Sequence, residues 1–412
     1  MVTPAEALQL ILDRVNPLAP VRQPLSEVLG LAVSEALHSA AQVPPFTNSA
    51  MDGYAVRSED LLTTTAERPI RLRVLGDLAA GGVSDAVVHP GEALRIMTGA
   101  ILPEGADAVV PVEDTSRGEG RGGDWVEVGK PVARGIHIRL AGEDLQLGQL
   151  LLRAGQGLRP GDIGALAAAG LPVVPVHPRV RVAVLTTGDE LVDVAEEPGP
   201  GHIRDANIHA VCAQVAACGA IPVPYPRVPD DRDTLRRVLE EALKADVVLT
   251  TGGISVGDYD FMKDLLEELG ARRVFWKVAQ KPGGPLGFWM LDDTPIFGIP
   301  GNPVAAMLMV EEYVRPALRK MMGFSQLHRP ANEALLEGGW QGRAGAPRTT
   351  FLRVVARREG GQLRAMLTGP QGSAILSSML TANALAVIPA GVDRVEPGGP
   401  VILHLTEEAE DH

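Results

Sequence analysis

The stretch VVLTTGGISVGDYDFMKD, residues 247–264, joins an apolar run, a glycine-rich turn and the acidic start of a helical pattern. The turn is not a P-loop, because no Gly-Lys-Ser/Thr sequence follows its glycines. The spacing of Gly252, Gly253 and Gly257 does not match the GxGxxG dinucleotide fingerprint either. Since glycine lets the backbone approach a ligand closely, the stretch predicts a strand, a ligand-binding turn and a helix.

Strand and helix patterns alternate on both sides of this stretch, from residue 178 to residue 324. Such alternation is typical of a parallel sheet with helices on both faces. We therefore expect residues 178–328 to form a three-layer α/β domain with a parallel-rich sheet. Its last helix begins at NPVAAMLMV, with Asn302 as N-cap and Pro303 in the first turn.

The remaining sequence predicts three further regions. Residues 1–42 and 151–177 carry helical patterns, including LSEVLGLAVSEAL and GDIGALAAAG, so we expect them to form a discontinuous helical N-terminal domain. Residues 43–150 contain short apolar runs broken by glycine and proline, which predict a β-rich extended domain. Short strands return in residues 329–412 and predict a small C-terminal β-barrel.

Composition excludes several classes of partner. The formal net charge of -13 disfavours nucleic acid or an anionic membrane surface as the main partner. No apolar run approaches the ~18 residues of a membrane span, and the N-terminus lacks the basic start of a signal peptide. Cys212 and Cys218 form no metal-binding pattern and are expected to be core thiols in a reducing compartment. We therefore expect a cytoplasmic protein.

Four strand ends should meet at one edge of the predicted sheet: TTGDE, TTGGISVGDYD, KVAQKPGG and GIPGNP. In an open parallel sheet, ligands bind outside the carboxyl ends of the strands. Lys277 and Lys281 bring positive charge there, whereas Glu190, Asp258 and Asp260 bring negative charge. Both signs together favour a phosphate-bearing ligand held with Mg²⁺. Taken singly, the aspartates are equally typical of helix caps and the lysines of solvated surface.

Seven motifs occur in order between residues 44 and 306: PPFTNSAMDGYAVR, RIMTGAILPEGADAVVPVED, HIRLAGEDLQLGQLLL, TTGDEL, TTGGISVGDYDFMKD, WKVAQKPGGPLGF and GIPGNPVAA. Together they closely resemble the MoeA family of molybdopterin molybdenumtransferases, to which the E domain of gephyrin is related. The resemblance implies an elongated four-domain subunit, a cytoplasmic homodimer and the insertion of molybdate into adenylylated molybdopterin. It also implies Mg²⁺ and the release of AMP.

The resemblance further implies site residues, matched motif by motif. The catalytic set is Asp52, Thr98, Arg139, Asp144, Glu190, Asp260, Lys277, Lys281, Arg353 and Ser373. The pterin-binding set is Thr187, Gly188, Gly252, Gly253, Ser255, Gly257, Lys281, Pro300, Gly301 and Asn302. The metal set is Glu190, Asp230, Asp258 and Asp260, with Asp231 as an alternative to Asp230. Two positions depart from the family pattern: Thr47 replaces a common aspartate, and Gly284 replaces a second lysine.

Charge suggests how these residues act. Arg139 and Arg353 are expected to offset the charge of molybdate, and Lys277 and Lys281 to hold the pterin phosphate. Asp52 and Asp144 lie far along the chain from the crevice, so a second subunit is expected to supply them.

Two other functions remain open at this point. A MogA-like molybdopterin adenylyltransferase would share the α/β domain, and such an enzyme is also a partner that the resemblance suggests. A gephyrin-like scaffold is the alternative outside the enzymes. Molybdate and tungstate are not distinguished.

Overall fold

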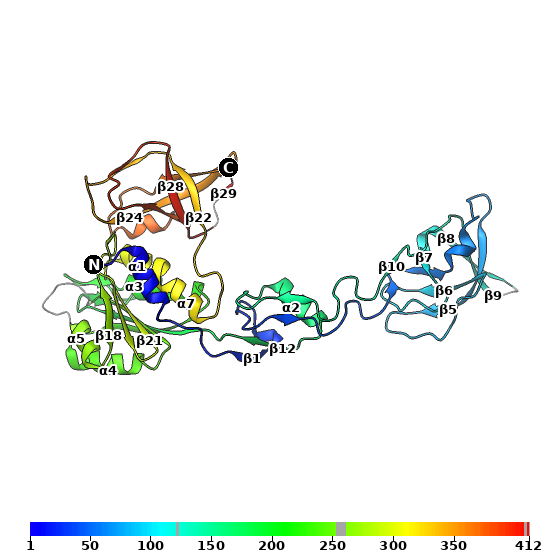
Figure 1. The fold of residues 1–412 in the computed structure, drawn as a ribbon, viewed down its shortest axis with the longest axis horizontal. Coiled ribbons are helices and arrows are strands. Elements are labelled where there is room, and N and C mark those ends of the chain that lie inside the picture. The colour runs from blue at the N-terminus through cyan, green and yellow to red at the C-terminus, as the bar shows by residue number, and fades with distance from the viewer. Residues whose placement is uncertain (121–122, 253–260, 408–409, 412) are drawn as a thin grey trace.

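The structure is a computed structural model that describes residues 1–120, 123–252, 261–407 and 410–411. It is elongated (Figure 1). One end carries an α/β region and a β-barrel, the other end a β-rich region, and a small module lies between them.

The α/β region is built on a sheet of six strands in the order β16-β13-β17-β21-β20-β18. The first four are parallel and are β16 (Ile221–Val228), β13 (Arg181–Thr187), β17 (Val247–Thr251) and β21 (Thr294–Ile299). The last two, β20 (Gly287–Leu291) and β18 (Arg272–Trp276), each run antiparallel to their neighbour. Two reversals restore the direction, so β18 also ends at the edge where the parallel strands end. The predicted parallel-rich sheet is confirmed, while β20 was not predicted.

Helices cover both faces of this sheet. On one face lie α3 (Ala206–Ala217), α6 (Pro303–Met309) and α7 (Arg315–Met321), and on the other α4 (Arg232–Ala242) and α5 (Phe261–Glu268). Alternate residues of β13 serve the two faces: Val182 and Val184 belong to the first buried cluster, Ala183 and Leu185 to the second. This is the two-residue period of a strand buried on both sides.

The predicted long helix after Asn302 is divided. A π-helical turn, η4 (Val310–Val314), separates α6 from α7. Pro316 lies at the start of α7 and has no backbone N–H to donate, which removes one bond of the regular helical ladder.

The expectation of a helical N-terminal domain is wrong. α1 (Pro4–Leu12) does form, with the capping box of Thr3 and Glu6, but it packs on η4 and α7 of the α/β region. In LSEVLGLAVSEAL only the short turn η1 (Leu25–Glu27) is helical. Gly30 adopts a left-handed φ of 77°, and Ala32 and Val33 form bridges with Gly157 and Val176. Tertiary pairing therefore overrides the helical pattern.

The module in the middle joins two distant segments. β1 (Val21–Pro24) pairs with β12 (Val173–Val176), and β2 (Leu37–His38) pairs with β11 (Leu150–Leu152). The short helix predicted at GDIGALAAAG is α2 (Pro160–Ala168), which packs against η1.

The β-rich region at the far end contains a sheet in the order β7-β4-β6-β5-β9-β8. Its strands are β4 (Gly53–Val56), β5 (Ile70–Leu78), β6 (Glu92–Ile96), β7 (Ala108–Pro111), β8 (Thr115–Gly120) and β9 (Gly123–Val128). Two short turns, η2 (Ser58–Leu61) and η3 (Val112–Asp114), lie beside it, and β3 (Asn48–Ser49) pairs with β10 (Ile138–Arg139) where the chain enters and leaves. The predicted β-rich character is confirmed.

The C-terminal barrel is also confirmed. Five strands close on themselves in the order β24-β25-β22-β28-β26, because β26 pairs back with β24. They are β24 (Thr349–Glu359), β25 (Gln362–Leu367), β22 (Ala331–Leu336), β28 (Gly399–Leu405) and β26 (Ala384–Ile388). The smaller elements of this part are β23 (Trp340–Gln341), β27 (Arg394–Val395), η5 (Leu376–Met379) and β29 (Glu410–Asp411).

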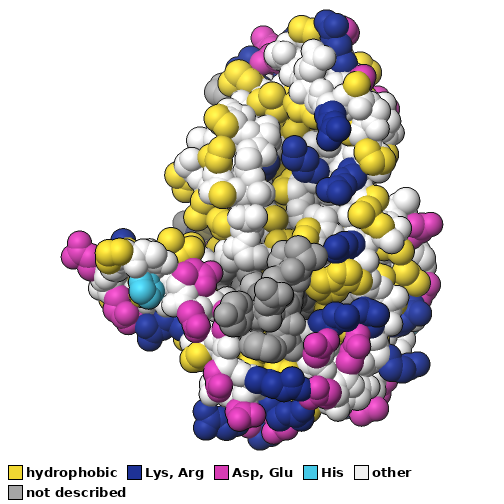
Figure 2. Space-filling model, turned by 90° about the vertical axis from the view of Figure 1, so that its left-hand side faces the viewer, with side chains coloured by type: hydrophobic (Ala, Val, Ile, Leu, Met, Phe, Trp, Pro, Cys, Tyr) yellow, Lys and Arg dark blue, Asp and Glu magenta, His cyan; other side chains and the backbone are white. Residues whose placement is uncertain are grey.

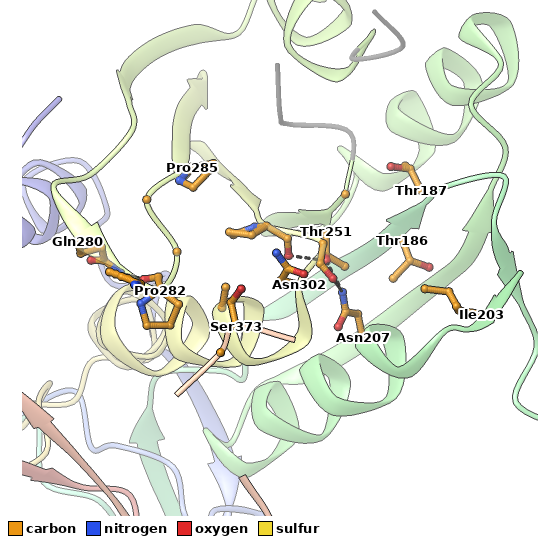
Figure 3. A pocket seen from close by; sticks show the side chains of 18 of the residues that line it. Thr186, Thr187, Ile203, Asn207, Thr251, Gln280, Pro282, Pro285, Asn302 and Ser373 are labelled. Atoms are coloured by element: carbon orange, nitrogen blue, oxygen red, sulfur yellow. Dashed lines mark hydrogen bonds between the residues drawn. The ribbon is translucent and has the colours of Figure 1, made fainter. Parts of the chain in front are cut away.

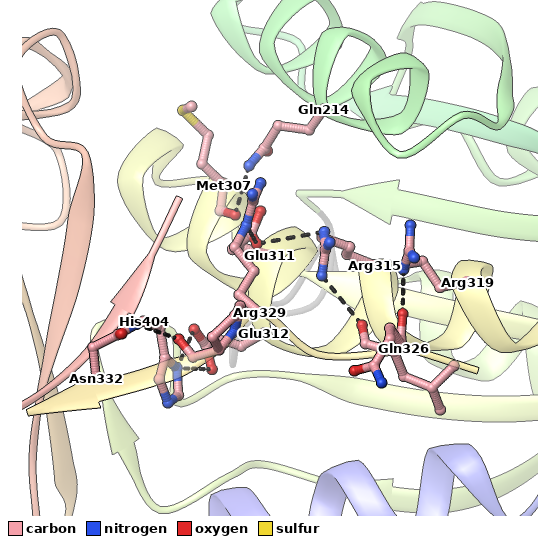
Figure 4. Close-up of polar contacts among 12 residues, drawn as sticks. Gln214, Met307, Glu311, Glu312, Arg315, Arg319, Gln326, Arg329, Asn332 and His404 are labelled. Atoms are coloured by element: carbon pink, nitrogen blue, oxygen red, sulfur yellow. Dashed lines mark hydrogen bonds and ion pairs between the residues drawn. The ribbon is translucent and has the colours of Figure 1, made fainter. Parts of the chain in front are cut away.

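Polar contacts fix the barrel and its linker to the helices of the α/β region (Figure 4). His404 of β28 contacts the Glu312 carboxylate at 3.0 Å, and Arg329 donates to Glu311 at 2.6 Å. A backbone ladder adds to them: β19 (Gln280–Lys281) of the α/β region pairs with the start of β24. The α/β region and the barrel therefore meet through both side-chain and main-chain bonds.

No helix in the described ranges is long and apolar enough to cross a membrane.

Candidate functional site

A cavity of about 930 Å³ opens at the carboxyl edge of the α/β sheet (Figure 3). Three strand ends form one side, through Thr187, Thr251 and Asn302. Strand β19 and the loop that follows it, residues 280–285 together, form the opposite side. The barrel closes the cavity with Arg348 and with residues 371–373. The predicted convergence of strand ends on one site is therefore observed, and the barrel adds the predicted Ser373 together with Arg348, which was not predicted.

Hydrogen bonds hold the strand ends together. Asn207 at the start of α3 donates to Thr251 Oγ1 at 2.9 Å and to the Gly301 carbonyl at 2.7 Å. Thr251 in turn donates to the Pro300 carbonyl at 3.1 Å. β14 (Leu191–Val192) and β15 (Ile203–Arg204) pair beside them and bring Glu190 to the rim. These bonds connect α3, β17 and the turn after β21 on one wall of the cavity.

Glycine is required where two strand ends approach. Gly252 has a φ of 88°, and a Cβ there would lie 2.5 Å from the Thr187 carbonyl oxygen. Gly188, with a φ of 146°, would place a Cβ 2.5 Å from the Glu190 carboxylate. Gly301 lies against Gly252, with 3.7 Å between its ideal Cβ and the Gly252 Cα. The backbone therefore forms much of this wall of the cavity.

Two polar side chains of the cavity wall lack the hydrogen bond that each would be expected to make within the described fold. Thr187 Oγ1 is buried and makes no hydrogen bond to any part of the chain that the structure describes. Asn302 occupies the predicted N-cap of α6, yet its side chain makes no capping hydrogen bond. Buried polar groups are normally paired, so an orphan hydroxyl beside a cavity indicates a place for a ligand or water.

Among the described residues, three side chains bring charge to the cavity. Lys281, Arg348 and Glu190 line it, and within the described ranges none of them has a hydrogen-bond or ion-pair partner for its charged group. Lys277 does not line it; its backbone instead bonds to Leu286 and, with a φ of 70°, forms part of the turn beside Val2. Figure 2 shows Lys and Arg side chains on both the α/β region and the barrel at this end of the molecule.

Acidic residues gather next to Glu190. The Asp230 backbone N–H donates to the Asp189 carboxylate at 3.2 Å. Burial, together with the charges of Asp189 and Glu190, raises the pKa of Asp230. Asp231 is engaged elsewhere as the N-cap of α4, accepting from the Thr234 N–H at 2.9 Å, and these bonds lower its pKa. Asp230 is therefore the acid that faces Glu190, and Asp189 is an acid that the sequence analysis missed.

Five predicted positions fall outside the described residues: Gly253, Ser255, Gly257, Asp258 and Asp260. Among the residues that the structure does describe, no three His, Cys, Asp or Glu side chains form a metal-binding group.

Arg353 differs from its predicted role. Its side chain is fully buried and donates to the carbonyls of Gln371 and Gly372, at 3.2 and 3.0 Å, and to Ser378 Oγ at 3.1 Å. Burial lowers the pKa of its guanidinium. Arg353 does not line the cavity, so it does not offer its charge to molybdate there. Instead it holds the loop that brings Ser373 to the cavity wall.

The other predicted residues lie at the far end of the molecule. Asp52 precedes β4 and accepts hydrogen bonds from the Thr98 N–H and hydroxyl, both at 2.7 Å, which lower its pKa. Arg139 belongs to β10, and the Asp144 N–H bonds to the Val43 carbonyl. None of these four lines the cavity, from which β4 and β10 are distant (Figure 1).

The class of protein follows from matches along the whole chain. Residues 2–170 match the MoeA N-terminal region, domains I and II. Residues 183–320 match a probable molybdopterin-binding domain, and residues 342–405 match the MoeA C-terminal region, domain IV. The cavity lies between the second and third of these segments.

Individual relatives extend over the full length. The chain is 36% identical over 399 residues to molybdopterin molybdenumtransferase 2 of Mycobacterium tuberculosis, covering 95% of this chain and 96% of that one. It is 35% identical to the molybdopterin molybdenumtransferase of Bacillus subtilis, over 93% and 89% of the two chains. A crystal structure of a MoeA protein from Pyrococcus horikoshii superimposes with a TM-score of 0.82 at 30% identity, over 99% of this chain and all of the other. The chain belongs to the MoeA family.

Proposed function

We propose that this protein is a molybdopterin molybdenumtransferase. It takes molybdate and adenylylated molybdopterin and gives molybdenum cofactor and AMP. The observation that carries the proposal is the cavity at the carboxyl edge of the sheet, lined by Lys281, Arg348 and Glu190, with Asp189 and Asp230 near Glu190. A reaction between two anions needs positive groups that offset their charge. The family membership supports the same conclusion.

The pterin and its phosphate bind in the cavity. Lys281 holds the phosphate, while Thr187, Asn302 and Ser373 offer polar groups. The glycines 252 and 301 leave room for the ligand to approach the backbone. Arg353 positions Ser373 through the carbonyls of residues 371 and 372.

Mg²⁺ is proposed at the acidic side of this site. Glu190 and Asp230 would supply carboxylate oxygens, the ligands that a hard cation prefers, and the described residues alone do not complete its ligand set. When bound, the ion supplies positive charge to the phosphoanhydride. Asp258 and Asp260 remain further proposed ligands outside the described residues.

The active form is a cytoplasmic homodimer. Asp52, Thr98, Arg139 and Asp144 lie too far from the cavity of their own chain to complete it, so a second copy brings them there. Each subunit is divided into domains at residues 1–42 with 151–177, 43–150, 178–328 and 329–412. The adenylyltransferase that produces the substrate is a transient partner.

The test is a single-turnover assay with pre-formed adenylylated molybdopterin, molybdate and Mg²⁺. We expect stoichiometric AMP release coupled to pterin-bound molybdenum, with no need for ATP. Consumption of ATP with unmodified molybdopterin would assign the protein to the adenylyltransferases instead. Pterin binding with no AMP release would favour a scaffold.

A further inference from the structure

Gly284 lies opposite an arginine from another part of the chain. An ideal Cβ on Gly284 would be 3.9 Å from the Arg348 Nη1, and its nearest other atoms are the carbonyl oxygens of Gln280 and Val278, at 3.4 and 3.6 Å. These are ordinary contact distances. Because residue 284 has no side chain, the space in front of the cavity wall is left to the guanidinium of Arg348.

A short ladder sets the position of Arg348. Gln280 pairs with Thr349 and Lys281 with Thr350, and the Thr349 N–H donates to the Ala279 carbonyl at 3.0 Å. Arg348 directly precedes the first paired residue of β24, and Lys281 is the last paired residue of β19. The backbones that carry the two cations are therefore held side by side by main-chain hydrogen bonds.

Nothing in the described structure neutralises Arg348. It lines the cavity, is exposed, and makes no hydrogen bond or ion pair with a described residue. Many other arginines of the barrel are engaged: Arg353 is buried among carbonyls, and Arg357 pairs with Glu337 at 3.0 Å. A guanidinium is well suited to two oxygens of one phosphate, because its donors form a planar fork.

We propose that Arg348 is a ligand-binding residue of the barrel that holds phosphate oxygens of the substrate in the space left by Gly284. This inference rests on the proposed function, and it adds a residue from the C-terminal barrel to the phosphate site of the α/β region. Lys281 and Arg348 then grip the ligand from two sides of the ladder, so ligand binding also strengthens the junction between barrel and sheet.

The experiment measures binding by calorimetry, with inorganic pyrophosphate and with molybdopterin as separate probes. Arg348→Ala should weaken both by about tenfold, the usual loss when one partner of a charge-assisted contact is removed. Arg343→Ala is the matched control: Arg343 is exposed in the same loop, does not line the cavity, and its removal changes the net charge equally. Equal affinities of these two variants would overturn the proposal.

A second variant separates charge from packing. Gly284→Lys has ordinary contacts around its Cβ, and Gly284 does not have a left-handed φ, so lysine is tolerated there. Combined with Arg348→Ala it should restore most of the lost affinity for both probes. If the double variant binds the probes as weakly as Arg348→Ala alone, positive charge at this place does not account for the lost affinity, and that assignment is overturned.

The measurements distinguish a failure of this inference from a failure of the proposed function. If pyrophosphate binding depends on Arg348 but AMP is never released, the proposed reaction fails while the anion site stands. If AMP release is normal and Arg348→Ala binds like Arg343→Ala, only the role of Arg348 fails.

Discussion

The cations of the cavity and the Asp52 carboxylate at the far end differ in whether they have hydrogen-bond partners. In the cavity, Lys281 and Arg348 have no partner among the described residues. At the far end, Asp52 is already satisfied by two hydrogen bonds from Thr98. A charge without a partner is prepared for a ligand, whereas a charge with two donors is held in one orientation. The comparison indicates that the cavity is prepared for a ligand and that the Asp52 carboxylate is held in one orientation, as the proposed homodimer requires if a second copy is to present it to the cavity.

Mixing two inactive variants gives the largest expected effect and tests whether the ends meet between subunits. Asp52→Ala and Glu190→Ala should each abolish AMP release. After the two proteins are unfolded together and refolded, half of the dimers are mixed, and each mixed dimer has one intact site. Activity should return to roughly a quarter of the wild-type value, as two-fold symmetry requires. If light scattering gave the mass of a monomer and the protein were fully active, the two ends would not meet between subunits.

Arg353 tests whether the cavity wall depends on a buried cation. Arg353→Met removes the charged donor that binds the carbonyls of residues 370–372, so the free energy of unfolding should fall by about 2 kcal/mol, since hydrogen bonds to a charged group contribute roughly 1.5–3 kcal/mol. Urea unfolding measures it. Arg357→Met is the control on the same strand: it removes only a half-exposed ion pair and should cost less than about 1 kcal/mol. Similar losses would mean that the burial of Arg353 has no special role.

Lys281 and Asp52 sharpen the contrast between free and paired charges. Lys281→Ala should weaken molybdopterin binding by about tenfold and leave the melting temperature unchanged, because the ammonium has no partner to lose. Asp52→Ala should lower the melting temperature and leave pterin binding to the cavity unchanged. Calorimetry and thermal unfolding on the same samples check both. If Lys281→Ala lowered the melting temperature and Asp52→Ala weakened pterin binding, the contrast between free and paired charges would be wrong.

His404 gives the smallest effect and is confined to the cavity end. Its hydrogen bond to Glu312 raises its pKa above the ordinary value of 6.5. A raised pKa in the folded state contributes stability below pH 6.5, and that contribution is lost as the pH rises through the folded value. We expect about 1 kcal/mol, reduced by partial exposure.

Unfolding of wild type and His404→Gln between pH 6 and pH 8.5 measures this contribution. The difference between them should shrink toward high pH. The nearby His328, whose pKa burial lowers, titrates with the opposite sign and is present in both proteins. A constant difference would mean that the contact is only steric.

The sequence predicted the part of the fold that periodicity determines. Alternating strands and helices gave the parallel sheet, and the strand ends gave the position of the cavity through Thr187, Gly252 and Asn302. The stretch LSEVLGLAVSEAL failed because its apolar spacing suits a helix equally well, and only pairing with residues 156–176 makes it extended.

The missed parts of the site depend on long-range register. Arg348 reaches the cavity because β24 pairs with β19, and no local pattern specifies that ladder. Arg353 is only five residues farther along the same segment, yet it is buried. Local sequence marks both as cations near a strand and does not distinguish a ligand-binding group from a positioning group. Asp189 was overlooked because its role rests on the return of Asp230 from another loop.

The division of the buried apolar residues into separate clusters bears on which parts of the molecule can unfold separately. Within the described chain, the main cluster joins α1, the α/β sheet and residues Phe351 and Leu385 of the barrel, whereas the clusters of the β-rich region contain only residues 54–138. No apolar cluster of the described residues spans both ends, so we expect heat or denaturant to unfold one end while the other stays folded. Under the proposed function, a molecule damaged in this way would still capture the pterin but would no longer present Asp52 to its partner, so it would occupy substrate without turning it over.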